Sequence, residues 1–229
     1  MSQKAYLYIL KTGLFLSLIT PLLVSGNFLF PYISTKQIYF NILMEILAVF
    51  WLAFIIKYPE WRPKKSLISF GLIAYFAAIF ISTVAGVDFN LSFWGDVERM
   101  LGFFHIFHFL IFYFILITVV REKKDWLYLL NLSVAVAVLV SLYSFKIKHS
   151  TIGNTAYVSG YLIFNIYFAL ILISNYKNWA YKAAYIIALV PMLLTFSRMQ
   201  TSGAYVGLGM SFLLLLFLFG ILNKNKKIR

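Results

Sequence analysis

Long apolar segments alternate with short polar connectors along the whole chain. Each apolar segment is 17–22 residues long, close to the ~20 residues that a helix needs to cross the hydrocarbon core of a bilayer. The segments cover residues 6–27, 38–56, 67–84, 103–120, 127–145, 157–174, 180–196 and 203–222. The pattern therefore predicts an all-α membrane protein with about eight transmembrane helices, arranged as a single polytopic domain over residues 1–229.

The composition agrees with this prediction. Hydrophobic residues make up 62% of the 229 residues and the mean hydropathy is +0.88, whereas soluble domains are about 45–50% apolar. The chain contains no cysteine, which excludes disulfides, thiolate catalysis and thiolate metal sites. The first apolar segment includes Lys11 and is longer than the apolar core of a signal peptide, so we expect it to be retained as a helix.

The basic residues are concentrated in alternate connectors. With the N-terminus inside, 14 lysines and arginines fall in the inner set and 5 in the outer set. The inner set is Lys4, Lys57, Arg62, Lys64, Lys65, Arg121, Lys123, Lys124, Lys177, Lys182, Lys224, Lys226, Lys227 and Arg229; the outer set is Lys36, Arg99, Lys146, Lys148 and Arg198. This distribution predicts that both termini are cytoplasmic. It also explains the net charge of +13 as a topology signal, so we expect no nucleic-acid partner.

Three of the outer cations are candidates to bind an anion. Arg99 lies in the stretch SFWGDVERMLG, where it can bind a ligand, pair with Asp96 or Glu98, or belong to a clamp at a helix start. Arg198 ends the seventh apolar segment, and its guanidinium can extend to lipid phosphate or bind an anionic substrate. Lys36 precedes the second segment, where a lone lysine is typical of an interface anchor.

Two ionisable residues lie inside apolar segments. Glu45 is about 12 Å below the outer surface, where an ionised carboxylate needs a partner or a water-filled cavity. Lys11 can reach toward it, which predicts a structural ion pair. A protonated acid bonded to a neighbouring helix and a proton-coupled transport role are the alternatives. His105 and His108 share one helix face, but no further ligand is near in sequence, so we expect a packed or interfacial pair and no metal site.

A turn is predicted at the head of the sixth apolar segment, in the stretch GNTAYVSGY. Gly153 and Asn154 form this turn, and Thr155 is the expected helix cap. We expect Asn154 to be a buried structural residue, as we expect for Glu45 and Lys11.

Four stretches, taken together, resemble the membrane part of the bacterial O-antigen ligase and O-antigen polymerase family. In order, they are FPYISTKQIYFNILMEIL, SFWGDVERMLGFFHIFHFLIFYFIL, TIGNTAYVSGYLIFNIYFAL and SGAYVGLGMSFLLLL. The resemblance covers about residues 20–220. Its most specific parts are SFWG…ERM…G and GN…Y…GY.

The resemblance implies a GT-C-like helical bundle in the bacterial cytoplasmic (inner) membrane. Proteins of this family transfer a saccharide from undecaprenyl pyrophosphate to an acceptor glycan, lipid or protein at the outer face, without metal or other cofactor. Their arginines bind the pyrophosphate. By this resemblance the candidate pyrophosphate ligands here are Arg198, Arg99 and Lys36.

The chain departs from the family pattern in two places. The family has an arginine directly before the Gly-Ala pair of the last segment, where this chain has Ser202, and the nearest arginine is Arg198. Either the helix is rewound locally so that Arg198 substitutes, or this site has lost its anion ligand. The family's catalytic histidine lies in a large outer loop beyond the segments seen here, and His149 does not match its motif. We therefore expect the N-terminal half of a larger architecture, incomplete as a catalyst, with a possible partner chain carrying the rest.

Two other functions fit the same residues. One is a transporter or flippase for an anionic lipid or small solute, with Glu45 as the coupling group. The other is a non-catalytic scaffold, derived from a truncated relative of the family.

Overall fold

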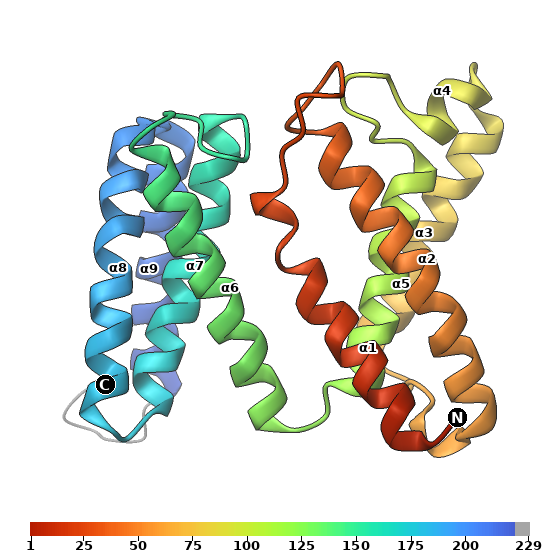
Figure 1. Cartoon of the computed structure of the whole chain (residues 1–229), viewed down its shortest axis with the longest axis horizontal. Coiled ribbons are helices and arrows are strands. Elements are labelled where there is room, and N and C mark those ends of the chain that lie inside the picture. The colour runs from red at the N-terminus through yellow and green to blue at the C-terminus, as the bar shows by residue number, and fades with distance from the viewer. Residues whose placement is uncertain (223–229) are drawn as a thin grey trace. The chain divides into compact units, whose positions relative to one another are not determined.

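The computed structural model describes residues 1–222, which contain helices and no strand (Figure 1). Lys224, Lys226, Lys227 and Arg229, counted above on the inner side, lie outside the described residues. The helices are α1 (Gln3–Ser17), α2 (Ser34–Lys57), α3 (Leu67–Ala85), α4 (Phe89–Trp94), α5 (Phe103–Val119), α6 (Lys123–Ser144), α7 (Thr155–Asn175), α8 (Trp179–Met199) and α9 (Ser202–Leu222), with 3₁₀ turns η1 (Thr20–Leu22) and η2 (Pro59–Trp61).

Six of the described helices are long and apolar enough to cross a membrane. They are α1 together with η1, α2, α3, α6, α7 and α8. Two further apolar stretches, Phe103–Val119 and Ser202–Leu218, are shorter. Large apolar side chains remain exposed on these helices, for example Leu67 and Ile68 on α3, as expected where a helix meets lipid rather than water. The chain is therefore a multi-pass membrane protein.

The first apolar segment does not form one continuous helix over residues 6–27. Helix α1 ends at Ser17 and is followed by η1, which contains Pro21. Proline lacks a backbone N–H and its ring clashes with the preceding turn, so it interrupts the helix here. The connector before the fourth segment holds an additional helix, α4, which the apolar pattern does not predict; the Asp88 carboxylate caps it by accepting from the Leu91 N–H at 3.0 Å.

The chain divides into two compact units, Met1–Val136 (unit 1) and Ala137–Arg229 (unit 2), with the boundary inside α6. In unit 1, helices α1, α2 and α5 pack around a core that includes Leu10, Leu14, Met44, Leu47, Phe54 and Ile115. A Cβ atom at Gly13 would collide with the Leu47 side chain, so this glycine allows α1 and α2 to approach closely. Helices α3 and α4 pack against α5.

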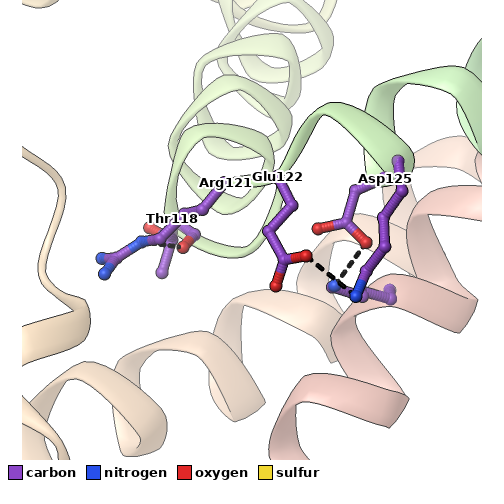
Figure 2. A network of polar contacts seen from close by, with 6 residues as sticks. Thr118, Arg121, Glu122 and Asp125 are labelled. Carbon is purple, nitrogen blue, oxygen red and sulfur yellow. Dashed lines mark hydrogen bonds and ion pairs between the residues drawn. The ribbon is translucent and has the colours of Figure 1, made fainter.

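The turn between α5 and α6 is held on both sides by charged side chains (Figure 2). Arg121 donates to the carbonyl oxygens of Thr118 (2.9 Å) and Glu60 (3.1 Å), and its guanidinium lies 4.2 Å from the centre of the Trp61 ring. It thereby satisfies carbonyl groups at the end of α5 and fixes η2 beneath it. The connector that contains η2 and the turn between α5 and α6 therefore have a fixed structure. Their basic composition alone predicts only on which side of the membrane they lie.

On the other side of the same turn, Asp125 forms an ion pair with Lys11. The Lys11 ammonium lies 2.7 Å from the Asp125 carboxylate, and the two side chains are 30% and 10% exposed. The expectation that Lys11 pairs with Glu45 is wrong. Because α6 begins beside α1, Asp125 offers an acid at the start of a helix, where the helix dipole also favours a negative charge.

Unit 2 contains α7, α8, α9 and the part of α6 from Ala137 onward. Buried hydroxyl groups join α6 to α8: Thr195 Oγ1 lies 2.8 Å from Ser144 Oγ and 3.1 Å from the Ser141 carbonyl oxygen. The hydroxyls of Tyr167 on α7 and Ser211 on α9 are 2.7 Å apart. Such hydrogen bonds between helices are a main source of attraction inside a bilayer, where lipid is as apolar as the side chains.

Replacement of Asp125 by Asn is expected to lower the free energy of unfolding by about 1–3 kcal/mol, because the half-buried Lys11 ammonium loses its charged partner. Unfolding of the purified protein in detergent measures this loss. The matched control is Glu122→Gln, since Glu122 pairs with Lys124 on the exposed surface, where ion pairs contribute little. Equal losses for the two variants would contradict the structural role of the Lys11–Asp125 pair.

Candidate functional site

The connector between α4 and α5 is closed at its base by two glycines. Gly95 has a φ of 82°, a backbone conformation that other residues rarely adopt. A Cβ atom at Gly102 would collide with the backbone of Phe93, Trp94 and Gly95. The chain therefore enters and leaves residues 95–102 at nearly the same place, and this segment is called the 95–102 loop below.

Arg99 has a fixed backbone and a free side chain in this loop. The Asp96 carboxylate accepts from the Arg99 N–H at 2.5 Å, and the Gln37 side-chain amide donates to the Arg99 carbonyl oxygen at 2.5 Å. Within residues 1–222, the exposed guanidinium has no hydrogen bond or ion pair. The acid therefore acts as a clamp on the turn, and Arg99 does not pair with Asp96 or Glu98.

Lys36 precedes Gln37, the residue that holds the loop to α2, in the first turn of that helix. Its ammonium donates to the Tyr32 carbonyl oxygen at 2.7 Å and lies 5.8 Å from the centre of the Tyr32 ring. These contacts hold the Lys36 side chain against the start of α2.

Below the loop, polar side chains join α2 to α5 at one-turn intervals. His105 Nδ1 donates to Asn41 Oδ1 at 2.8 Å, since an amide oxygen can only accept. One turn further, His108 Nε2 lies 3.3 Å from Glu45 Oε1. Glu45 is thus bonded to a neighbouring helix, which was an alternative to the pair with Lys11. Its side chain is 54% exposed, whereas that of His108 is 3% exposed, so the expectation of a buried Glu45 is wrong.

A cavity of about 200 Å³ opens beside these pairs within unit 1. Its walls are mainly apolar, and its polar lining comes from Asn41, Glu45 and His105. Trp94 and Met100 line the side nearest the 95–102 loop. This volume can hold several water molecules, so the carboxylate of Glu45 faces a space and is not enclosed by side chains.

In unit 2, α6 and α8 touch through Ser144 and Thr195 and leave an apolar groove along the rest of their length. The groove has a volume of about 660 Å³. It runs from Ala184 to Leu194 on α8, about 15 Å at 1.5 Å per residue. Its walls are Val138, Leu142, Phe145, Ala184, Ile187, Ala188, Val190, Pro191 and Leu194.

Arg198 lies at one end of this groove. Its guanidinium stacks on the ring of Phe145, a wall residue, with 4.9 Å between the guanidinium carbon and the ring centre. Arg198 is exposed, and among the described residues no acid pairs with it. The Arg198 guanidinium is therefore held over the aromatic ring, and its N–H groups remain available to bind an anion.

The start of α9 does not bring Ser202 into line with Arg198. Helix α8 continues to Met199, Gln200 adopts a left-handed conformation with φ of 53°, and α9 begins at Ser202. Arg198 and Ser202 thus lie on different helices, on either side of a tight turn.

Asn154 is exposed and caps α7. Its side-chain oxygen accepts from the N–H of Ala156 at 2.8 Å. The expectations that Asn154 is buried and that Thr155 is the cap are wrong, because Thr155 is already the first residue of the helix.

No group of three or more His, Asp or Glu side chains that could hold a metal occurs in the described part of the chain. His105 and His108 are bonded to different partners. Comparisons with protein families, curated proteins and solved structures found no match to the chain.

The Gly102→Ala variant is expected to lose about 1–3 kcal/mol of stability, since the new methyl group overlaps the backbone at the base of the 95–102 loop. Thermal unfolding in detergent measures the loss. Gly71→Ala is the matched control: Gly71 lies within α3 with nothing near its Cβ position, so alanine there should be neutral or stabilising. A Gly102→Ala variant as stable as this control would show that the loop is not closed as described.

Proposed function

We propose that the chain binds a lipid-linked pyrophosphate and takes part in glycan transfer of the O-antigen ligase type. The observation that carries this proposal is the apolar groove between α6 and α8 that ends at Arg198. An apolar groove with a guanidinium at its end is complementary to an amphipathic molecule that has a long hydrocarbon tail and an anionic head. Polyprenyl pyrophosphates have this form, and the sequence resemblance points to the same class.

The chemistry of the two parts fits this ligand. A guanidinium binds phosphate oxygens through two parallel hydrogen bonds, which a lysine ammonium cannot do. Stacking on Phe145 limits the orientations of the guanidinium, so less freedom is lost when an anion binds. The side chains that line the groove are all apolar, as an isoprenoid chain requires, and Pro191 on α8 removes a backbone donor from the same wall.

The proposed topology has eight spans and cytoplasmic termini, with α5 and α9 crossing the membrane in addition to the six longer helices. The 14 to 5 distribution of basic residues supports this orientation. Helix α5 has 17 residues, about 25 Å, and is hydrogen-bonded along its length to α2, a candidate span. In this topology Arg198 lies at the outer surface of a bacterial cytoplasmic membrane, where a lipid-linked glycan presents its head group.

Arg99 and Lys36 are proposed as further pyrophosphate ligands within unit 1. The unpaired guanidinium of Arg99 supports this role, because its loop is fixed by Asp96 and Gln37 while the side chain stays free. Lys36 is already bonded to a carbonyl oxygen, so its contribution is expected to be smaller. No catalytic residue is assigned among these side chains.

Arg198→Ala should weaken the binding of a short-chain polyprenyl pyrophosphate by about tenfold to hundredfold, because a hydrogen bond between charged groups contributes about 1.5–3 kcal/mol. Binding to the purified protein in lipid nanodiscs is measured by calorimetry. Arg198→Lys should recover only part of the affinity, since an ammonium is not bidentate. Lys182→Ala, at the opposite end of α8, is the control and should bind like the unmodified protein.

The tail-binding part of the proposal is tested separately with Ala188→Trp, which fills the groove far from Arg198. This variant should lose affinity for the polyprenyl pyrophosphate and keep its affinity for inorganic pyrophosphate. Unchanged lipid affinity in both Arg198→Ala and Ala188→Trp would overturn the proposal.

A further inference from the structure

The hydrogen bonds of His108 show how many protons its contact with Glu45 requires. His108 Nδ1 lies 2.7 Å from the Phe104 carbonyl oxygen, which can only accept, so Nδ1 carries a hydrogen. A neutral imidazole then has a bare Nε2, and this is the atom that faces Glu45 Oε1 at 3.3 Å. A bare nitrogen and an ionised carboxylate are both acceptors. A hydrogen bond between them therefore requires one additional proton.

We propose that Glu45 and His108 form a proton-binding site within the membrane-spanning part of unit 1. The extra proton lies between Oε1 and Nε2, either as a carboxylic acid bonded to neutral imidazole or as a carboxylate bonded to imidazolium. When the proton leaves to water, two acceptors face each other and the contact is lost. Binding of one proton thus closes a link between α2 and α5, and its release opens that link.

The surroundings allow this proton to exchange. The Glu45 side chain is half-exposed and lines the cavity of about 200 Å³, whereas His108 is buried behind it. Intramembrane acids typically face such cavities and partners rather than lipid. Within lipid no hydrophobic effect holds α2 against α5, so a hydrogen bond between these helices contributes to their attraction.

The other charged groups around the pair are already engaged or lie outside the apolar part. On α5, His105 is bonded to Asn41, and on α1, Lys11 is paired with Asp125. On α2, the lysines at the two ends are bonded to backbone carbonyl oxygens. Helices α3 and α4 and the turn η1 contain no Asp, Glu, Lys, Arg or His. The remaining charged groups of the 95–102 loop are Asp96, Glu98 and Arg99. The additional proton is therefore assigned to the contact between Glu45 and His108.

The first test compares the thermal unfolding of the full chain and of Glu45→Gln in nanodiscs between about pH 5 and pH 10. Proton binding favours the folded state, so the melting temperature of the unmodified protein should fall as the pH rises. The fall attributable to one link is about 2–4 °C. In Glu45→Gln the amide donates to Nε2 without any added proton, so this part of the fall should be absent. Glu98→Gln, an exposed loop carboxyl, should follow the unmodified protein.

The second test needs no change at the site. Nitrogen NMR of the histidines in the chain, with His105→Gln and His149→Gln used for assignment, reports which ring nitrogen of His108 carries hydrogen. Nδ1 should be protonated at every pH, and only the proton between Nε2 and Glu45 should be lost. A neutral His108 with hydrogen on Nε2, or identical pH profiles for the unmodified protein and Glu45→Gln, would overturn the proposal. Because neither test involves a lipid pyrophosphate, the outcome is independent of the proposed function.

Discussion

Both units are held together by hydrogen bonds between polar side chains on neighbouring helices. In a bilayer the hydrophobic effect does not drive one apolar helix onto another, so packing and such hydrogen bonds supply the attraction. In unit 1, α2 is bonded to α5 from Asn41 and His105 to Trp51 and Thr118, whose side chains are 3.0 Å apart. In unit 2, Ser144 is bonded to Thr195 and Tyr167 to Ser211. The positions of the candidate ligands follow from these few bonds.

This constraint explains why each candidate site lies beside a pair of side chains that are hydrogen-bonded to each other. In unit 2, α6 and α8 are fixed at Ser144 and Thr195, and the groove opens where their contact ends. In unit 1, Gln37 holds the 95–102 loop on α2 and thereby fixes the backbone of Arg99. The same set of bonds places Glu45 against His108. The groups proposed to bind an anion or to exchange a proton with water, which are Arg99, Arg198 and Glu45, are ones that the packing leaves exposed.

The apolar pattern was sufficient to predict the all-helical fold and most helix positions, because a run of about 20 apolar residues has few alternatives in a membrane. The pattern was less informative about where helices begin and end, because single residues decide this. Pro21 divides the first segment, and Asp88 caps a short helix. Partners could not be predicted, since pairing depends on which helices become neighbours. Lys11 therefore bonds to Asp125, 114 positions away, and Glu45 to His108. Arg198 could be singled out from its position, but the groove beneath it depends on the separation of α6 and α8.

The most direct test of the central claim is the location of a bound polyprenyl pyrophosphate on the chain. A polyprenyl pyrophosphate with a photoreactive group in its tail can be cross-linked to the protein in nanodiscs, and the modified residues identified by mass spectrometry. Modification concentrated on the walls of the α6–α8 groove, between Leu142 and Phe145 and between Ala188 and Leu194, and suppressed by excess unlabelled lipid pyrophosphate, is the predicted result. Modification spread evenly over exposed apolar helices such as α3, without such competition, would contradict the account.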